Sequence, residues 1–219
     1  MGKGADVNSR DSGDVTALMW AVMNKHNMIV KLLLDQPDID VNFKGASKGL
    51  TALYIAASHA NVEAMQLILA TNSVDVNCED SDGGTALHTA VANGNFEAIQ
   101  LLLAHPRVDV NHSDHEGFTA LLLCTVIEGH WKIMQLLLAH PMMCVNHSDN
   151  TGNTALICAA FNGHEKSVQL LLEDSRVDVN YNGCNALHAA VAKDHVGVVG
   201  KLLEHPNINL DESLEGLAR

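Results

Sequence analysis

A short marker returns along this chain at an almost constant step, and this periodicity constrains the fold more than any other feature. Each marker is the asparagine that closes a "DVN" or "CVN" segment, and successive markers are 34 or 35 residues apart. The markers are Asn8, Asn42, Asn77, Asn111, Asn146 and Asn180. A second series begins an apolar run with Thr-Ala-Leu or Asn-Ala-Leu, at Thr16, Thr51, Thr85, Thr119, Thr154 and Asn185. Such a period predicts a solenoid, in which each unit buries its apolar face against its neighbours.

One unit, "GGTALHTAVANGNFEAIQLLLAHPRVDVN" over 83–111, predicts two helices. Thr85 is expected to cap the first, because its hydroxyl can accept a hydrogen bond from an unpaired amide of the first turn. Gly94 can adopt the left-handed conformation that ends this helix. The second helix over 96–104 stops at Pro106, and His105 near its end can stabilise the helix dipole when protonated. The inward faces are expected to carry Ala86, Leu87, Ala90, Val91, Ile99, Leu102 and Leu103.

The segments "GGTALHTAV", "GNTALICAAFNGH" and "LLLEDSRVDVN" resemble the ankyrin repeat, and the resemblance covers the chain from Gly4 to about Asp211. It implies an all-α solenoid of stacked helix-turn-helix units with β-hairpin or loop fingers. Two departures from the family pattern are alanine in place of proline after the threonine, and an "HPRVDVN" segment one residue longer than usual. Neither is expected to prevent the fold.

The repeat markers predict a single ankyrin-repeat domain over 1–219, with units starting near 9, 43, 78, 112, 147 and 181. Residues 1–8 are interpreted as the tail of a preceding repeat. Residues 212–219 are interpreted as a C-terminal cap or as the start of a further repeat. We therefore expect the chain to be a piece of a longer array.

The repeat spacing is interrupted in three places. The fourth unit has one extra residue between Leu121 and Gly129, so its first helix must bulge or its turn must be longer. The finger between Asn42 and Thr51 is one residue longer than the usual finger, and the one between Asn180 and Asn185 is shorter. Loops tolerate such drift at low cost. A bulge at a functional site is the other interpretation of the fourth unit.

Composition excludes several classes of function. With 26 acidic and 13 basic residues, the formal net charge of −13 opposes binding to nucleic acid. No apolar run approaches the roughly 18 residues of a membrane span, so we expect no membrane insertion. Five cysteines form no closely spaced framework, which favours a reducing compartment. We expect a monomeric, intracellular and cytoplasmic protein.

The resemblance implies that the fingers and the exposed part of each first helix line a concave groove that binds another protein or peptide. Counting in register places Phe118, Ile127 and Phe161 on the groove face of neighbouring units, where exposed apolar groups could form a hot spot. The alternative is that these side chains fold down over the local core. The candidate binding residues are Leu50, His59, Asn93, His115, Glu116, Phe118, Ile127, Glu128, Asn150, Asn153, Phe161 and Asn162.

Histidines invite a metal hypothesis, which the repeat geometry disfavours. His112 and His147 occupy equivalent finger positions, and stacked elements lie about 8 to 10 Å apart, too far to share a zinc ion bound at about 2 Å. We expect no metal and no cofactor. His88 and His188 match the family's motif histidine, for which the resemblance implies a structural hydrogen-bonding role.

Catalytic motifs are missing as well. The chain has no P-loop, no G-x-S-x-G and no H-E-x-x-H. We therefore expect a non-catalytic protein-interaction module. Two alternatives remain open: a structural spacer or substrate, and a metal-dependent enzyme. For the substrate, the resemblance implies hydroxylation of finger asparagines, with Asn77, Asn111 and Asn180 as candidates.

Overall fold

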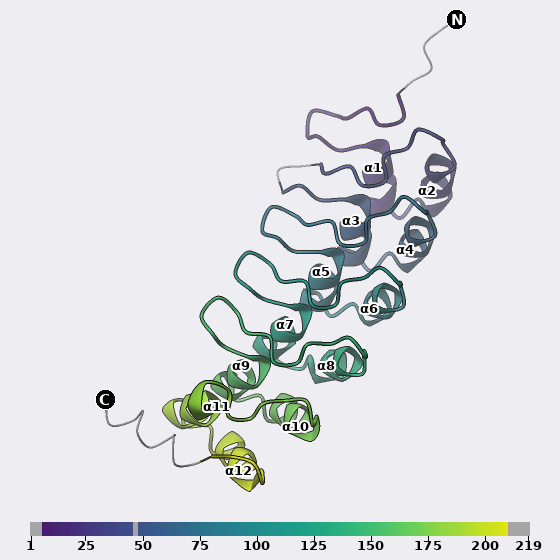
Figure 1. Ribbon diagram of the computed structural model, residues 1–219. Coiled ribbons are helices and arrows are strands. Elements are labelled where there is room, and N and C mark those ends of the chain that lie inside the picture. Colours follow the sequence, from purple (N-terminus) through teal and green to yellow (C-terminus); the bar gives the residue numbers. More distant parts are fainter. Residues whose placement is uncertain (1–5, 46–47, 210–219) are drawn as a thin grey trace, which may run out of the picture. The chain divides into compact units, whose positions relative to one another are not determined.

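The computed structural model describes residues 6–45 and 48–209. Within these residues, all of the named secondary-structure elements are α-helices (Figure 1). The chain divides into two compact halves, residues 1–115 and 116–219, which are described separately. The N-terminal half contains α1 (Ala17–Met23), α2 (Asn27–Leu34), α3 (Ala52–Ser58), α4 (Val62–Leu69), α5 (Ala86–Ala92) and α6 (Phe96–Leu103). The C-terminal half contains α7 (Ala120–Val126), α8 (Trp131–Leu138), α9 (Ala155–Asn162), α10 (Glu165–Glu173), α11 (Tyr181–Ala192) and α12 (Val196–Glu204).

Each half is a stack of helix pairs in two layers. In the N-terminal half, α3 packs between α1 and α5, while α4 packs between α2 and α6. In the C-terminal half, α9 packs between α7 and α11, and α10 packs between α8 and α12. Loops project from the first-helix side of each stack as fingers (Figure 1). Isolated β-bridges such as Gly45 to Leu50 and Ser148 to Thr154 close three of them. The predicted all-α repeat solenoid is confirmed.

The residues predicted to begin and end the first helices do so through local hydrogen bonds and backbone conformation. Thr16, Thr51 and Thr119 accept hydrogen bonds from the third amide of their helices at 3.1 to 3.3 Å. The Thr85 amide donates to His88 Nδ1 at 3.2 Å, so the motif histidine has a structural hydrogen bond there. Gly94 has φ 69°, the left-handed conformation expected at the end of α5.

Two expectations for the end of α6 need correction. Ile99 and Leu102 are fully buried, but Leu103 is only half-buried, because it sits at the edge of the helix face that meets the first layer. The His105 ring accepts a hydrogen bond from the Arg107 amide through Nδ1, at 3.3 Å. Burial, followed by the nearby Arg107 charge, lowers the pKa of His105. The ring therefore ends the helix as a neutral acceptor, not as a cation.

The finger asparagines tie consecutive repeats together. Asn77 Nδ2 donates to Arg107 O at 2.8 Å, and Asn77 Oδ1 accepts from the Asp109 amide at 2.8 Å. Asn180 Nδ2 donates to Asn207 O at 2.8 Å in the same way. Asn8, Asn42 and Asn146 make the equivalent pair of bonds. The sequence marker is thus a structural rung, because one amide side chain satisfies a donor and an acceptor of the next repeat.

The breaks in spacing have simple structural outcomes. The extra residue of the fourth repeat lengthens a turn and does not bulge the helix: α7 ends at Val126, and four residues, 127–130, precede α8. Only three residues, 93–95, separate α5 from α6. The short finger before Asn185 is absorbed into a helix, since α11 already begins at Tyr181. The expected finger at that position is therefore replaced by helix.

Candidate protein-interaction surface

The predicted groove residues divide into two groups by exposure. Eight are exposed: His59, Asn93, His115, Glu116, Glu128, Asn150, Phe161 and Asn162. Four are half-buried: Leu50, Phe118, Ile127 and Asn153. All twelve come from fingers, from the ends of first helices or from the turns that directly follow these helices. Their order along the chain assigns four to the N-terminal half and eight to the C-terminal half.

Phe161 is the main exposed aromatic side chain among the predicted residues. It is the second-last residue of α9 and is 48% exposed. Lys193, after α11, places its ammonium 4.4 Å from the ring centroid. Such a cation–π contact orients the ring at a modest gain of about 0.5 to 1 kcal/mol at an exposed site. Phe161 therefore presents an ordered apolar surface bordered by a charge.

Phe118 and Ile127 are less exposed to a binding partner than the register suggested. Both are half-buried, and Ile127 lies in the lengthened turn after α7 in an extended conformation. Val126, the last residue of α7, takes the helical position that Phe161 takes in α9, and it is 48% exposed. Counting backwards from Gly129 missed Val126. Counting forwards from Thr119 would have found it, because the extra residue follows the helix.

Fingers of the C-terminal half bring the predicted rim residues together. The Asn150 amide donates to Glu116 O at 3.1 Å, which joins neighbouring fingers. Asn153 Nδ2 donates to Thr151 Oγ1 at 2.6 Å within its own finger. Asn162 Nδ2 donates to Thr125 O at 3.3 Å and so links α9 to α7. These polar groups are held in place by hydrogen bonds, so part of their hydrogen-bonding capacity is already used.

The four predicted residues of the N-terminal half have structural bonds as well. Leu50 exchanges two backbone hydrogen bonds with Gly45, at 2.8 and 3.0 Å. His59 Nδ1 lies 2.9 Å from Ile55 O, and Asn93 Nδ2 donates to Thr89 O at 2.8 Å, so both side chains end first helices. The His115 amide donates to Asp82 O at 3.0 Å between fingers. The exposed atoms of His59, Asn93 and His115 remain accessible to a partner.

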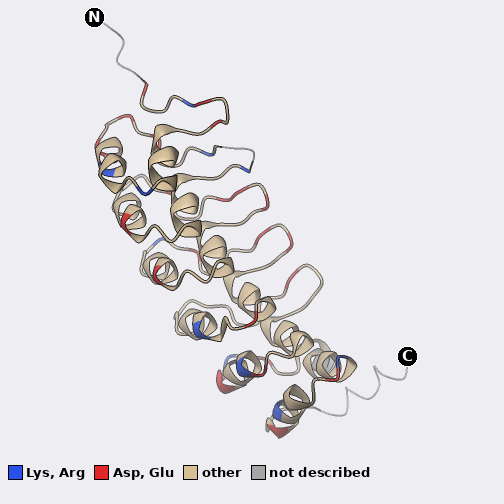
Figure 2. Ribbon diagram, turned by 180° about the vertical axis from the view of Figure 1, so that it is seen from behind, with Lys and Arg blue, Asp and Glu red and all other residues tan. Residues whose placement is uncertain are grey.

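Acidic side chains predominate on several fingers (Figure 2). Some of them shape the loop itself: Asp80 Oδ1 accepts from the amides of Asp82 and Gly84 at 2.9 and 2.8 Å. Asp149 makes the same turn with the amides of Thr151 and Asn153, at 2.9 Å each. Burial raises the pKa of the Asp149 carboxyl, but hydrogen bonds from Asn153 and Thr151 outweigh it, and the net shift is downward. Asp149 therefore stays ionised as part of the finger.

Two histidines and a glutamate meet at the third and fourth fingers. His88 is buried, and its ring meets that of His112 edge to face with centroids 5.9 Å apart. His112 Nε2 lies 3.2 Å from Glu79 Oε1 and 3.2 Å from Gly83 O. The described residues hold no group of three or more His, Cys, Asp or Glu side chains suited to a metal ion. The contacts of this cluster are ring packing between His88 and His112 and polar contacts of His112 with Glu79 and Gly83.

Three of the described cysteines, Cys78, Cys124 and Cys158, have thiols whose pKa is raised, so none of these three is a candidate nucleophile. Burial raises the pKa of Cys78 to about 11 and that of Cys158 to about 11. Burial also raises the pKa of Cys124, which is fully enclosed in α7. Cys158 is half-buried. These three thiols stay protonated at neutral pH, and protonated thiols are poor nucleophiles.

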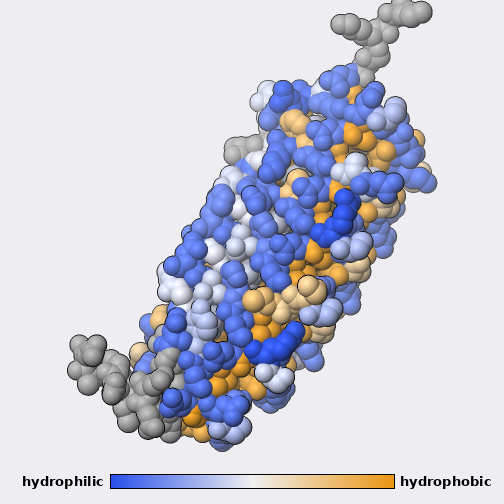
Figure 3. Space-filling model, in the orientation of Figure 1, coloured by the Kyte–Doolittle hydropathy of each residue, from blue (hydrophilic) through white to orange (hydrophobic). Residues whose placement is uncertain are grey.

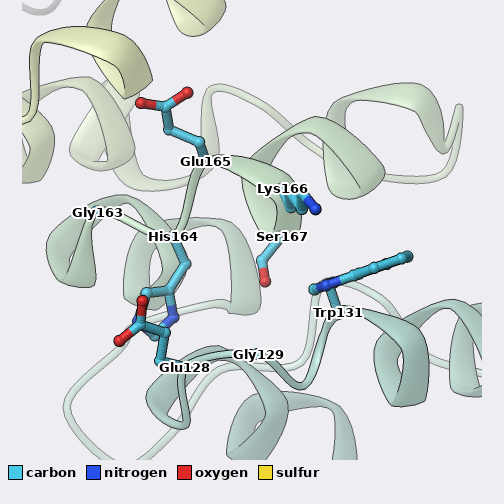
Figure 4. A pocket seen from close by; sticks show the side chains of 8 residues that line it. All are labelled: Glu128, Gly129, Trp131, Gly163, His164, Glu165, Lys166 and Ser167. Atoms are coloured by element: carbon cyan, nitrogen blue, oxygen red, sulfur yellow. The ribbon is translucent and has the colours of Figure 1, made fainter.

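A pocket of about 430 Å³ lies in the C-terminal half between the lengthened turn and the start of α10 (Figure 4). Its walls include Glu128, Trp131, His164 and Lys166. His164 Nδ1 is buried and has no hydrogen-bond partner in the described part of the chain. The equivalent Asn95 of the N-terminal half donates to Ala57 O at 2.7 Å. Of the predicted residues, Glu128 alone contributes to this pocket, which lies on the turn side of the helices.

The surface view separates two kinds of surface (Figure 3). The finger edge is mainly hydrophilic, and hydrophobic groups gather beside it, over the side of the second helices. Among the described residues, no helix is long and apolar enough to cross a membrane. Stacked helix pairs, a rung of finger asparagines and an exposed loop edge together define a helical repeat solenoid.

Comparison with known proteins gives the family. The sequence pattern described as "Ankyrin repeats (3 copies)" matches residues 1–80, 60–149 and 126–213. The chain belongs to the ankyrin repeat family. Ankyrin repeats are in general protein–protein interaction modules, and their fold is typically non-catalytic.

Curated relatives match over short stretches. Human (Homo sapiens) "Transient receptor potential cation channel subfamily A member 1" is 38% identical over 69 residues, which is 32% of this chain and 6% of that protein. "Rabankyrin-5" of Mus musculus is 31% identical over 80 residues, which is 36% of this chain and 7% of that protein. The chain thus spans less than a tenth of the length of either relative.

Solved structures match over most of the chain. The ankyrin repeat domain of Bcl-3, described as a member of the IkappaB protein family, has a TM-score of 0.79 at 25% identity, covering 89% of this chain and 86% of that one. An ankyrin repeat domain from Acinetobacter baumannii AYE has a TM-score of 0.75 at 27% identity, covering 85% and 95%. The ankyrin repeat protein EF0377 has a TM-score of 0.71 at 27% identity, covering 77% and 85%.

Proposed function

We propose that this chain is a non-catalytic module that binds a partner protein or peptide through its concave groove. The contact is centred on Phe161 in the C-terminal half. Val126, at the equivalent helical position of α7, extends the apolar contact, and Glu116, Asn150 and Asn162 form its polar border. The module acts as a monomer in the cytoplasm and without nucleic acid, in keeping with a formal charge of −13.

The observation that supports this proposal is the ordered exposure of Phe161. Its ring is 48% exposed and held at 4.4 Å by the Lys193 ammonium, so little side-chain entropy is lost when a partner covers it. Aromatic anchors in polar surroundings supply most of the energy at protein interfaces. Phe118 is half-buried in the same half of the chain and belongs to the proposed contact.

The test is a pull-down with quantitative mass spectrometry from a relevant lysate. Phe161→Asp is expected to lose partners that the unaltered chain retains, and Val126→Asp is expected to lose the same ones. Val196→Asp is the matched control, because Val196 is 75% exposed at the start of a second helix, away from the groove. Thermal unfolding of each variant checks the fold. Identical partner sets for Phe161→Asp and Val196→Asp would refute a groove centred on Phe161.

The alternative of a substrate for asparagine hydroxylation is weaker on physical grounds. The amides of Asn77 and Asn180 each donate and accept within the folded stack. An enzyme would have to open a rung to reach either side chain, at a cost of about 1 to 3 kcal/mol for the unpaired groups. Intact-mass analysis after exposure to an asparaginyl hydroxylase tests this. A mass increase of one oxygen on folded protein would favour the substrate role, and an unchanged mass favours the binding module or a spacer.

A further inference from the structure

The lengthened turn of the fourth repeat coincides with the loss of a hydrogen bond that joins neighbouring turns elsewhere. Asn95 begins α6 and donates from Nδ2 to Ala57 O of the preceding repeat, at 2.7 Å. His195 begins α12, and its Nε2 lies 3.0 Å from Phe161 O in the same way. His164 begins α10 at the equivalent position, but its buried Nδ1 has no partner among the described residues. The pocket of about 430 Å³ lies where this link is missing.

A serine in the pocket wall takes a position that is apolar in the other second helices. Ser167 is the third residue of α10, and its equivalents are Ile29, Ala64, Ala98, Ile133 and Val198. Ser167 is 4% exposed, and its hydroxyl points into the pocket (Figure 4). It makes no hydrogen bond with the described part of the chain, and a buried polar group without a partner is costly. The hydroxyl is therefore available to a polar group that enters the pocket.

The wall on α8 is the indole ring of Trp131, which already attracts cations. Trp131 is the first residue of α8 and is half-buried. The Lys166 ammonium lies 4.7 Å from the ring centroid, and the Lys132 ammonium lies 5.4 Å from it. Among the aromatic side chains, tryptophan offers the most favourable face to a cation. Both lysines are exposed, so their ammonium groups can turn into water when another cation takes the ring.

The pocket continues between α8 and α10. A cavity of about 210 Å³ shares Trp131 and Lys166 with it, and a further cavity of about 400 Å³ shares Leu170 and Glu173 with the second one. We call these two cavities, which are lined by residues within 131–139 and 166–174, the crevice. Because neighbouring cavities share wall residues, a chain segment anchored in the pocket can follow the crevice.

Acidic side chains predominate in the lining of the pocket and the crevice, where Lys166 is the basic residue. The carboxylates are those of Glu128, Glu165, Glu173 and Asp174. Asp174 is paired with Arg176 at 2.6 Å, and the Glu165 carboxylate lies against Gly197 of α12. Glu128 is exposed in the lengthened turn and forms no ion pair within the described residues. Its charge favours a cation in the pocket and opposes an anion.

A guanidinium group matches these walls. It is planar, so it can stack on the Trp131 ring, and it is less strongly hydrated than the ammonium of Lys166 that it would displace. Its N–H groups are donors only, which suits the Glu128 carboxylate and the Ser167 hydroxyl as acceptors. A pocket of about 430 Å³ also has room for the aliphatic part of an arginine side chain.

We propose that the pocket binds an arginine side chain of a basic segment of a partner protein. The guanidinium stacks on Trp131 and bonds to Glu128 and Ser167, and the rest of the segment lies along the crevice. The formal charge of −13 favours a basic partner. This site does not rest on the groove around Phe161, because none of the residues proposed for that contact lines the pocket.

The test is a displayed library of ten-residue peptides, selected on the Trp20→Phe chain, in which Trp131 is the remaining tryptophan. Peptides that also bind the Trp20→Phe/Trp131→Ala chain are removed first. The selected peptides are expected to be enriched in arginine and to change the Trp131 fluorescence to saturation. Citrulline in place of the arginine keeps the shape without the charge, and it is expected to weaken binding about tenfold.

Variants of the chain assign the contacts. Glu128→Gln is expected to weaken binding about tenfold, and Glu165→Gln, directed at α12, is the matched control with unchanged binding. Ser167→Ala is expected to weaken binding several-fold without lowering the unfolding transition, because alanine holds this position in α4 and α6. Lys166→Met is expected to tighten binding about threefold, because it removes the competing cation. Phe161→Ser is expected to leave binding unchanged.

Several results would overturn the proposal. One is a selection that yields no peptide, or peptides without arginine. Another is binding that is indifferent to Glu128→Gln in a chain that unfolds normally. Acidic peptides that lose affinity in Lys166→Met would assign the pocket to an anion. Peptides that lose affinity in Phe161→Ser and not in Glu128→Gln would occupy the groove, which would support the proposed function and refute the arginine site.

Discussion

Helices α2 and α6 have nearly the same leucine-rich ending, and their burial differs greatly. "KLLLD" closes α2 and "QLLLA" closes α6. Leu102 in α6 is fully buried, while its equivalent Leu33 is half-buried, and Leu32 is 62% exposed where Leu101 is half-buried. A solenoid repeat contacts only its neighbours, so the same local sequence stabilises the fold by different amounts according to what lies on either side. The position of a leucine in the stack, more than its residue type, therefore decides how much it contributes to the free energy of unfolding.

Truncating the covered leucine should have the largest effect. Leu102→Ala is expected to destabilise the chain by about 2 to 5 kcal/mol, because it removes a fully buried side chain and leaves a cavity. Urea unfolding monitored by circular dichroism measures this loss. A change below about 1 kcal/mol would mean that the α6 core relaxes around the cavity, and the contrast with α2 would disappear.

Breaking a finger rung should come next. Asn77→Ala is expected to cost about 1 to 3 kcal/mol, because the Arg107 carbonyl and the Asp109 amide both lose a partner. Asn93→Ala is the control, since its side chain bonds only within its own helix among the described contacts. Equal losses for the two variants in urea unfolding would show that the rung adds nothing beyond local capping.

An exposed and a buried aspartate that form the same finger turn can be compared through the pH dependence of stability. Asp11 and Asp149 make the same turn, but Asp11 is exposed in the first finger, whereas Asp149 is 8% exposed. Because the folded-state pKa of Asp149 is lowered, its contribution is present above the unfolded pKa and is lost as pH falls through the folded one. Asp149→Asn is expected to remove part of the stability at pH 7 and to flatten the decline below pH 4. An unaltered pH profile would mean that Asp149 titrates alike in both states.

The smallest effect is expected at the exposed Leu32 of α2. Leu32→Ser should change the free energy of unfolding by less than about 0.5 kcal/mol, as for most exposed positions. Differential scanning calorimetry of Leu32→Ser and Leu102→Ala, run side by side, compares the stability losses of the exposed and the buried leucine directly. A loss comparable to that of Leu102→Ala would show that Leu32 is buried in solution and would contradict the contrast between α2 and α6.

Much of the fold could be predicted because its signals are local. Threonine caps, the left-handed Gly94 and the asparagine markers each follow from short-range chemistry repeated at a fixed step. The candidate groove was predictable only to the level of the register. Phe161 is exposed where the register placed it, but Phe118 is half-buried, and the register alone does not give how far a side chain is buried. Val126 was missed because sequence spacing alone could not place the extra residue in the helix or in the turn.

The sequence by itself determined the repeat, its two helices and the asparagine that closes each finger, because these depend on periodicity and on bonds within a few residues or to an identical neighbour. Tertiary structure alone decided which repeats are covered. Ile29 and Ala98 hold the same register position, yet one is 47% exposed and the other 1%. Burial is a property of the neighbour that a side chain meets, and no local pattern records whether that neighbour is present.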